Sequence, residues 1–404
     1  MKKIFQTKYL TALLFVLLLA VVYTFSLSPF LKGFRIAAEN LLNKHTLDLS
    51  AVEQKYHDGF AGTDYFVTLN GGFQRLMGAR EINDRYRLDN GQVTYIIGEC
   101  DVDGIAENTV RFRDALQEMD IPMVYVNAPF KINESDKQLP VGVMDFSNEN
   151  ANRFLSRLDE SGVPTLDLRQ NIEEEGLDHY SLFYPTDHHW TAEAGFWATG
   201  QIVEYLAGLD DSFAVDNRIF DLSHYDKSIY EDIFLGSAGR RVGPLYTGFD
   251  DITLIRPRFD TALSFSVEEK NILRQGNFAD AFLFMQRLTL KDMFNTNAYS
   301  VYCGTDYGLL KVRNFGGEQN LQPGCTQKKI LLIKDSFSCV VIPFLSLAYE
   351  DVHVVDLRYL EDDLMEYIHS YQPDLVMVLY NPGAYGTNNL NMFDFMNQGK
   401  LKTR

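Results

Sequence analysis

The stretch Lys329-Ile-Leu-Leu-Ile-Lys334, followed directly by Asp335 and Ser336, decides the fold. Its apolar run predicts a buried strand, and residues 337–349 predict a helix. Ser336 therefore stands between the end of a strand and the start of a helix. Such a turn holds a hydroxyl above the edge of a sheet and directs helix amides toward it. Serine is also a common helix N-cap, so its position alone leaves two roles open.

The same alternation of strands and helices extends along the chain. Further strands are predicted at 93–97, 121–129, 165–169, 352–357 and 374–380, and further helices at 107–119, 148–160, 192–206 and 360–371. This order predicts a mostly parallel sheet covered by helices on both faces. Ligands of such sheets bind at the carboxyl ends of the strands, so we expect Ser336, Arg358 and Asn381 to gather there. Residues 210–325 lack the pattern and are predicted to be a long insertion that shapes a substrate surface.

The loop Asp187-His188-His189-Trp190 supplies what a serine nucleophile needs, which is a base and a carboxylate that orients it. In an extended loop, residues two apart point to the same side. We therefore expect Asp187 to hold the imidazole of His189, and His189 to take the proton of Ser336, while His188 points away. Trp190 is expected either to wall this site or to belong to the core.

Histidines beside a carboxylate can also bind a metal ion. Asp-His-His is the name-giving motif of a family of metal-dependent phosphoesterases, but those need further Asp and His clusters. The other histidines of this chain are scattered without ligand spacing. We therefore predict no metal and no other cofactor.

Three arginines are candidates for contact with a substrate. Arg358 follows the strand 352–357 and is expected to contact substrate or to pair with Asp356. Arg240 and Arg241 follow the turn Gly236-Ser-Ala-Gly239 and are candidates for binding an acidic glycan. A structural or surface salt bridge is the competing interpretation for each of them.

The formal net charge of the 404 residues is −18, which disfavours binding to nucleic acid. The N-terminus differs, because Lys2, Lys3 and Lys8 precede an apolar run over 9–27. That run has about the ~20 residues that a spanning helix needs, and no clean Ala-x-Ala cleavage site follows it. We favour an uncleaved signal anchor over a cleaved signal peptide. The basic flank would stay in the cytoplasm and place the rest outside the cell membrane.

The predicted organisation is an anchor or signal over 1–32, a linker and N-terminal extension over 33–90, and a catalytic domain over 91–404. Of the four cysteines, Cys303 and Cys325 flank a loop and are the predicted disulfide. The alternative is that all four are free, small, buried residues.

The tract Phe183-Tyr-Pro-Thr-Asp-His-His-Trp-Thr191, followed by a helix, resembles the signature of the DHHW proteins. These are similar to the periplasmic alginate O-acetyltransferases, which carry Asp-x-His-Trp and are related to the SGNH hydrolases. Ile333-Lys-Asp-Ser-Phe-Ser338 resembles the nucleophile turn of that group. The resemblance extends from about residue 90 to the end of the chain.

The resemblance implies an SGNH-hydrolase-like, flavodoxin-like domain in a circularly permuted motif order, with Asp187 and His189 ahead of Ser336. It implies acyl transfer through a serine ester. Asn381 is the best positional match for the oxyanion asparagine of SGNH enzymes. The family's Gly-x-Asn-Asp is replaced here by Tyr380-Asn-Pro-Gly383, and capping a turn is the competing role.

The expected function is therefore extracytoplasmic O-acetyl transfer to a polysaccharide or cell-wall glycan. The implied partner is an integral-membrane acyltransferase that supplies the acyl group. One alternative is an extracellular carbohydrate esterase with the same triad. Another is a non-catalytic glycan-binding subunit of an exopolysaccharide complex.

Overall fold

A computed structural model describes residues 2–44, 62–316, 324–386 and 392–396. The chain divides into two compact units, Met1–Asn70 and Gly71–Arg404. The first unit contains the long helix α1 (Lys2–Lys44), which covers the predicted anchor segment. Within the described ranges, no helix combines the length and the apolar character needed to cross a bilayer. Residues 45–61 of the predicted linker lie outside the described residues.

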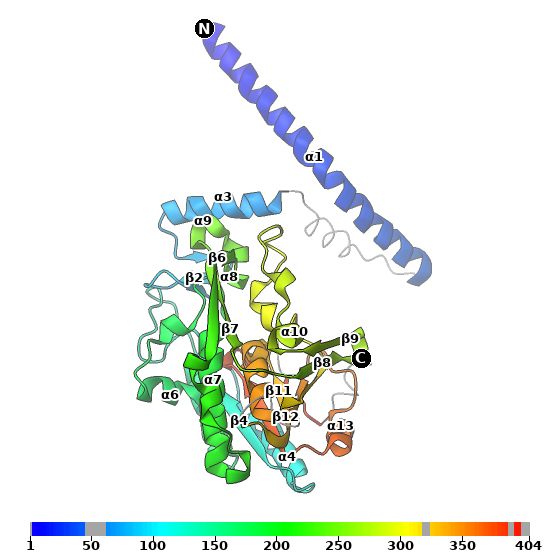
Figure 1. The fold of residues 1–404 in the computed structure, drawn as a ribbon. Coiled ribbons are helices and arrows are strands. Elements are labelled where there is room, and N and C mark those ends of the chain that lie inside the picture. Colours follow the sequence, from blue (N-terminus) through cyan, green and yellow to red (C-terminus); the bar gives the residue numbers. More distant parts are fainter. Residues whose placement is uncertain (1, 45–61, 317–323, 387–391, 397–404) are drawn as a thin grey trace. The chain divides into compact units, whose positions relative to one another are not determined.

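The second unit is built on an eight-stranded mixed sheet (Figure 1). Its strands, in spatial order, are β5 (Thr165–Asp167), β4 (Met123–Asn127), β13 (Leu375–Tyr380), β11 (Thr326–Lys334), β12 (Tyr349–Val355), β10 (Leu309–Asn314), β8 (Leu263–Val267) and β9 (Ile272–Gly276). The first five are parallel, and the last three join by antiparallel pairing. The carboxyl ends of the parallel strands therefore share one edge of the sheet.

Helices cover both faces of this sheet, as the alternating pattern predicts. On β11, Ile330 and Leu332 face one core and Leu331 and Ile333 face the other, because side chains of a strand alternate. Burial on both faces explains why these strands are continuous apolar runs. One core contains α7 (Ala192–Leu209) and α12 (Ile342–Ala348). The other contains α4 (Asp103–Gln117), α5 (Ser147–Glu160) and α13 (Leu364–Tyr371).

The predicted insertion over 210–325 is only partly separate from the sheet. It supplies the antiparallel strands β8, β9 and β10 and a two-stranded ribbon of β6 (Tyr225–Phe234) and β7 (Asp250–Pro257). Among its described residues are the helices α8 (Ser237–Val242), α9 (Pro244–Thr247) and α10 (Phe278–Phe282). Its 3₁₀ turns include η6 (Met285–Arg287) and η7 (Ala298–Tyr302).

The predicted strand at 93–97 does not join the central sheet. Only β3 (Val93–Thr94) forms, in a small sheet with β1 (Glu81–Ile82) and β2 (Arg85–Arg87). These strands pack on α8 and α9 through Ile82, Val93 and Tyr246. The second compact unit begins at Gly71, within α3 (Thr63–Leu76), and the domain boundary expected at residue 91 stays a prediction.

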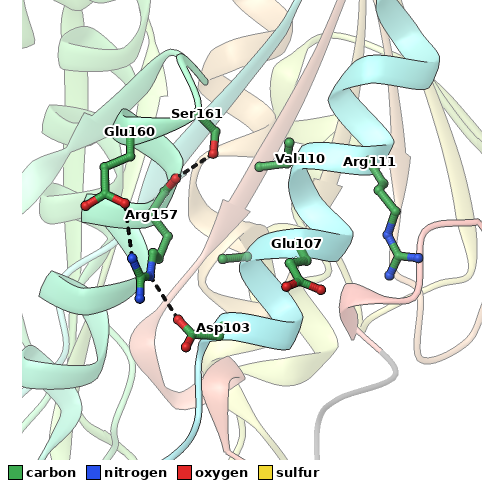
Figure 2. A pocket seen from close by; sticks show the side chains of 8 residues that line it. Asp103, Glu107, Val110, Arg111, Arg157, Glu160 and Ser161 are labelled. Atoms are coloured by element: carbon green, nitrogen blue, oxygen red, sulfur yellow. Dashed lines mark hydrogen bonds and ion pairs between the residues drawn. The ribbon is translucent and has the colours of Figure 1, made fainter.

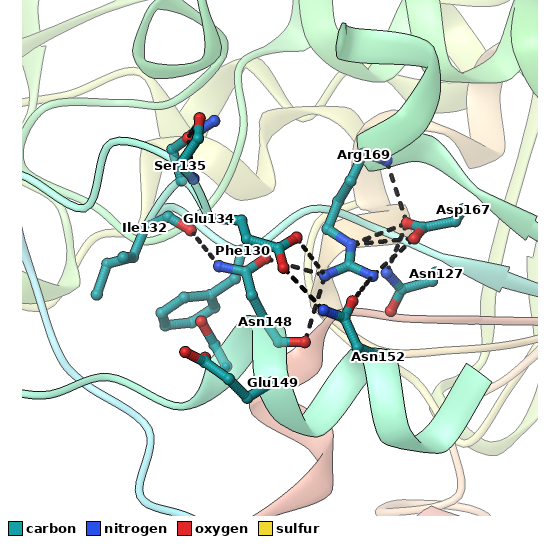
Figure 3. A network of polar contacts seen from close by, with 12 residues as sticks. Asn127, Phe130, Ile132, Glu134, Ser135, Asn148, Glu149, Asn152, Asp167 and Arg169 are labelled. Carbon is teal, nitrogen blue, oxygen red and sulfur yellow. Dashed lines mark hydrogen bonds and ion pairs between the residues drawn. The ribbon is translucent and has the colours of Figure 1, made fainter. Parts of the chain in front are cut away.

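A polar network ties the ends of β4 and β5 to their covering helices (Figure 3). Asn127 donates to Asp167 at 2.9 Å, and Arg169 of α6 (Leu168–Glu174) grips the same carboxylate at 2.7 Å. Arg169 also donates to the side chain of Asn148 at 3.0 Å, and Asn148 donates to the carbonyl of Ile132 at 2.9 Å. The network fixes the segment that follows β4.

Candidate active site

The loop between Phe183 and Trp190 closes on itself, because these two residues pair as an antiparallel bridge. The amide of Tyr184 donates to the carbonyl of His189 at 3.2 Å. The hydroxyl of Thr191 then caps the start of α7 by accepting from the amide of Ala194. The loop is therefore a rigid turn between a 3₁₀ segment, η1 (His179–Leu182), and a long helix.

The structure brings Asp187, His189 and Ser336 together. Nδ1 of His189 lies 2.5 Å from Oδ1 of Asp187, and Nε2 lies 2.7 Å from Oγ of Ser336. Because Nδ1 faces a carboxylate, it carries the proton and donates it in a hydrogen bond. Nε2 is then left to accept from the serine hydroxyl. This is the hydrogen-bonded order that nucleophilic catalysis by serine requires.

Asp187 is only 1% exposed, and both of its carboxylate oxygens are engaged. Oδ1 also accepts from the amide of His189 at 2.9 Å, and Oδ2 accepts from the amide of Ser237 at 2.5 Å. Burial raises the pKa of Asp187, but the charges of His189 and His188 and these hydrogen bonds outweigh it and hold the pKa well below its usual range. Asp187 is thus an ionised carboxylate that orients its histidine.

His188 does not point away from the site. Its ring lies 3.8 Å from the ring of His189, and its Nδ1 lies 2.8 Å from Oγ of Ser237. The expectation assumed an extended loop, whereas the loop bends at this point and turns both imidazoles inward. Burial and the neighbouring His189 lower the pKa of His188 to about 3, so it stays neutral.

Ser336 begins the 3₁₀ helix η8 (Ser336–Val340) directly after β11. Asp335 caps this turn by accepting from the amide of Phe337 at 2.9 Å. Asn381 donates to Asp335 from its amide at 2.8 Å and from its side chain at 2.6 Å, and it accepts from the amide of Gly383. Asn381 thus caps this turn and is not among the residues that line the cavity, and its oxyanion role stays a prediction.

Tyr299 supports the site from η7. Its hydroxyl donates to the carbonyls of Ser336 and Phe337, both at 3.0 Å. Its ring stacks on His189 with centroids 4.1 Å apart and planes at 14°. Trp190 donates to the carbonyl of Phe337 at 2.8 Å and is fully buried, so it belongs to the core.

A cavity of about 330 Å³ opens over Ser336 and His189. Its walls come from the Asp-His-His loop, α8, the segment 287–306 and the ends of β11 and β12. The lining residues are Asp187, His188, His189, Ser237, Arg240, Arg287, Asn297, Tyr299, Ser300, Gly304, Thr305, Asp306, Ser336, Cys339 and Arg358. Most of these side chains are polar, as a site for a hydroxylated ligand would require.

A buried charge cluster closes one side of this cavity. Arg358 pairs with Asp356 through bonds of 2.9 and 2.6 Å and approaches Asp306 at 3.4 Å. Arg358 thus pairs with Asp356 and also lines the cavity. Lys334 pairs with Asp306 and, at 3.3 Å, with Asp356. Burial raises the pKa of Asp306, but Lys334 and Arg358 outweigh this and lower it to about 2.

Arg240 and Arg241 are neighbours in α8 but have different surroundings. Arg240 lines the cavity, whereas Arg241 is exposed and is not among the lining residues. Successive residues of a helix point in directions about 100° apart, which explains the difference. Arg241 instead contributes its backbone carbonyl, which accepts from Asn83 at 2.9 Å. Arg241 therefore does not line this cavity, and its role in binding a glycan stays a prediction.

The predicted disulfide between Cys303 and Cys325 is absent, because all four cysteines are free thiols. Cys303 donates to the carbonyl of Cys339, just beyond the carboxyl end of β11, whereas Cys325 precedes its amino end. A strand of nine residues is about 30 Å long. A disulfide needs Cα atoms less than about 7 Å apart.

Sequence reasoning missed Lys131, which holds the loop from beneath. Its fully buried Nζ donates to the carbonyls of Tyr184, Asp187 and Val93 at 2.7 to 2.9 Å and to that of Pro185 at 3.1 Å. The only available signal was a lysine close after an apolar strand, and such a position does not identify its partners.

Asp250 holds the same loop from β7 and was missed as well. It accepts from the amide and the hydroxyl of Thr186 at 2.9 and 2.7 Å. Burial lowers the pKa of Lys131 and raises that of Asp250, against the attraction between the two. Two buried ionisable side chains therefore fix the residues that flank Asp187.

Asp187, His188 and His189 are also the described residues with ligand atoms close enough, within 4.8 Å of one another, to hold a metal ion. However, His189 already uses Nδ1 toward Asp187 and Nε2 toward Ser336. A metal ion would have to displace one of these hydrogen bonds. The donor set therefore suits proton transfer better than metal binding.

A larger hollow, of about 560 Å³, lies between α4 and α5 (Figure 2). Arg157 crosses it and pairs with Asp103 at 2.9 Å and with Glu160 at 3.1 Å. The single hydroxyl among its lining residues, that of Ser161, donates to the carbonyl of Arg157. Its lining contains no histidine or cysteine, so it offers no nucleophile with a base.

Comparison with known proteins bears on the family and the fold. Residues 102–213 match the family model described as the SGNH hydrolase-like domain of acetyltransferase AlgX. The matched segment contains Asp187 and His189 but ends before Ser336. No curated protein matches the sequence.

Two solved structures share the fold. Bacillus cereus PatB1 has 18% sequence identity and a TM-score of 0.62, with 77% of this chain and 99% of that chain covered. A DHHW family protein from Eubacterium siraeum has 17% identity and a TM-score of 0.58, with 78% and 97% covered. The resemblance predicted from the Asp-His-His-Trp loop and the SGNH-hydrolase-like α/β fold are thus confirmed. The permuted order of motifs stays a prediction.

Proposed function

We propose that this chain is an O-acyltransferase that transfers acetyl groups to hydroxyls of a polysaccharide or cell-wall glycan, with Ser336 as the nucleophile. The observation that carries the proposal is the unbroken hydrogen-bonded series from Asp187 through His189 to Ser336, beside a polar cavity. The match to the acetyltransferase AlgX domain supports acyl transfer as the reaction class.

In the first half-reaction, Oγ of Ser336 attacks the carbonyl carbon of the acyl donor, and Nε2 of His189 takes the hydroxyl proton. The ionised Asp187 stabilises the imidazolium that forms. When the tetrahedral intermediate collapses, the bond to the donor's leaving oxygen breaks, and His189 returns its proton to that oxygen. The acyl group is then held as an ester on Ser336.

In the second half-reaction, a sugar hydroxyl enters the cavity and gives its proton to Nε2 of His189 as it attacks the ester. Collapse expels Oγ of Ser336, which regains the proton from His189. The backbone amide of Ser336, at the start of η8, is the donor that we propose for the negative charge on the carbonyl oxygen. Asn381 is left out because its side-chain amide donates to Asp335 and it is not among the residues that line the cavity.

We also propose that residues 1–32 anchor the chain in the cell membrane with the catalytic unit outside. The support is the basic flank of Lys2, Lys3 and Lys8 before an apolar run. The acyl group would then come from an integral-membrane partner, because an acyl donor made inside the cell must cross the bilayer.

Covalent labelling of Ser336 by phenylmethylsulfonyl fluoride tests the triad. PatB1 has been solved with a sulfonyl adduct, which makes this reagent class a suitable choice. We expect mass spectrometry to find one sulfonyl group, on the peptide that contains Ser336, and no labelling in Ser336→Ala. His189→Ala should label far more slowly. Equal labelling of the wild type and Ser336→Ala would remove Ser336 as the nucleophile and would favour the non-catalytic alternative.

Release of a chromophore from an acetyl ester, measured with and without oligosaccharide acceptors, separates a transferase from an esterase. A transferase should consume the ester faster when an acceptor is present and should yield acetylated sugar. If free acetate is the sole product and no acceptor changes the rate, the chain is a carbohydrate esterase.

A further inference from the structure

Two arginines in the cavity over Ser336 have no hydrogen-bond or ion-pair partner among the described residues. Three arginines line it, and Arg358 is committed to Asp356 and Asp306. Within the described part of the chain, the guanidinium groups of Arg240 and Arg287 form neither an ion pair nor a hydrogen bond. Each therefore keeps its planar set of N–H donors for something that enters the cavity.

This arrangement runs against the charge of the whole chain. The protein has 55 acidic and 37 basic residues, so a surface arginine would ordinarily find a carboxylate nearby. The cavity lining contains three arginines and two aspartates. Both aspartates already have partners, because Asp187 pairs with His189 and Asp306 pairs with Lys334 in the charge cluster. A small positive site on a strongly acidic protein attracts an anion into the cavity, whereas the rest of the surface repels it.

The position of Arg240 is fixed by close packing. A side chain at Gly236 would lie 2.4 Å from the carbonyl oxygen of Thr186 and from Cβ of Asp187. The amide of Gly239 also donates to that carbonyl at 2.9 Å. Because α8 touches the catalytic loop through these glycines, Arg240 keeps a constant relation to Asp187. Arg287 comes from η6, on a different segment of the wall.

We infer that Arg240 and Arg287 bind an anionic group of the substrate, so that the acceptor is an acidic glycan with its charge close to the hydroxyl that reacts. The inference rests on the proposed function, because it places this group in the cavity that holds Ser336. Two guanidiniums suit a carboxylate or a phosphate, since both present oxygens to paired N–H donors. A cavity of about 330 Å³ is at the small end for ligand sites, which keeps the charge within a sugar unit or so of the nucleophile.

Matched charged and neutral sulfonyl fluorides test this inference without knowledge of the natural glycan. The charged probe is para-(fluorosulfonyl)benzoate, and its neutral counterpart of similar shape is para-(fluorosulfonyl)benzamide. In the full-length protein, we expect the benzoate to modify Ser336 about tenfold faster than the benzamide, as one charge-assisted hydrogen bond would give. The preference should fall as salt is raised.

Variants then assign the preference to individual residues. Arg240→Gln and Arg287→Gln should each remove much of the benzoate's advantage, because the benzoate rate falls far more than the benzamide rate. Arg241→Gln, which removes the exposed neighbour on the same helix, should behave as the wild type. A phosphonate-bearing sulfonyl fluoride that reacts faster than the benzoate would identify phosphate as the preferred anion.

The two proposals fail in different ways. If the benzamide labels Ser336 but the benzoate has no advantage, the anion site is wrong and the nucleophile stands. The same conclusion follows if Arg241→Gln loses the preference as fully as Arg240→Gln. If neither reagent labels Ser336, the proposed function fails and takes this inference with it.

Discussion

The ring of Tyr299 lies flat against the imidazole of His189, with centroids 4.1 Å apart and planes at 14°. The same residue donates its hydroxyl to the carbonyls of Ser336 and Phe337. One side chain thus sets the plane of the base and the position of the turn that carries the nucleophile. The aromatic ring and the hydroxyl should contribute separately to these two tasks.

We expect Tyr299→Leu to slow the labelling of Ser336 by about a hundredfold, because loss of the flat ring lets the imidazole tilt and small misplacements are costly. Tyr299→Phe keeps the ring and should slow labelling less than tenfold. It should also lower the free energy of unfolding by about 1 kcal/mol through loss of the hydroxyl's hydrogen bonds. Rates from mass spectrometry and urea melts measure both effects. Equal rates for the two variants would show that stacking has no role.

Substitution of Gly236 should affect the site more than the fold. In Gly236→Ala, the new methyl would lie 2.4 Å from Thr186 and Asp187, so α8 must shift and the amide of Ser237 must leave Asp187. Labelling of Ser336 should fall more than tenfold, while the unfolding free energy falls by about 1–3 kcal/mol. Gly208→Ala is the control, because nothing lies within 4 Å of its new methyl near the end of α7. It should keep the rate and add up to about 1 kcal/mol of stability.

Lys131 should be among the most costly lysines to replace. Lys131→Met removes an ammonium that satisfies four buried carbonyls and leaves Asp250 without a cationic neighbour. We expect a loss of about 3–5 kcal/mol in the free energy of unfolding, measured by urea denaturation. Lys137→Met is the matched control on the same segment, since Lys137 pairs with the half-exposed Glu149 and should contribute less than about 1 kcal/mol. Similar losses in both variants would contradict the assigned role.

Stability should fall in mild acid because His179 is buried in its neutral form. Burial lowers its pKa to about 4, from an ordinary value near 6.5, despite the carbonyls of Phe130 and Lys131 that accept from its Nε2. Between these values the unfolded chain binds the proton and the folded chain does not, so the contribution is present above pH 6.5 and is lost as the pH falls toward 4. The loss should reach about 3 kcal/mol at pH 4.

The variant His179→Gln isolates this effect, because its amide can replace the Nε2 donor but does not titrate. Its unfolding free energy should depend less steeply on pH between 6.5 and 4 than that of the wild type. His369→Gln, at an exposed position of α13, should leave the slope unchanged. If His179→Gln and the wild type have parallel pH profiles, the acid sensitivity comes from other groups.

The sequence was sufficient for features that depend on local pattern. Short apolar runs predicted β4, β11, β12 and β13, because burial on both faces leaves few polar positions in the middle of such strands. The spacing of Asp187 and His189 predicted a shared site, and the strand-to-helix position of Ser336 placed it at the same edge.

Features that depend on distant packing were not predictable in this way. The partners of Lys131 and Lys334 come from segments 22 to 56 residues away, and no periodicity identifies them. The disulfide was inferred from a loop between two cysteines, but β11 separates their surroundings. The β-branched run at 93–97 does not join the main sheet. The amide of Val93 instead donates to the carbonyl of Pro185, just before the Asp-His-His loop.

The short helix α8 contributes two groups to the site. Its first amide, from Ser237, binds Asp187, and its fourth residue, Arg240, faces the cavity. A different acceptor that required this helix to move would also disturb Asp187, the carboxylate that orients the proposed base. A substitution on α8 is therefore expected to change both the preference for an acceptor and the reaction rate. Arg287 is carried by another segment and is free of that constraint. Substitutions in the cavity wall around Arg287 should therefore change the glycan preference with less loss of rate than substitutions on α8, both among relatives and in redesign.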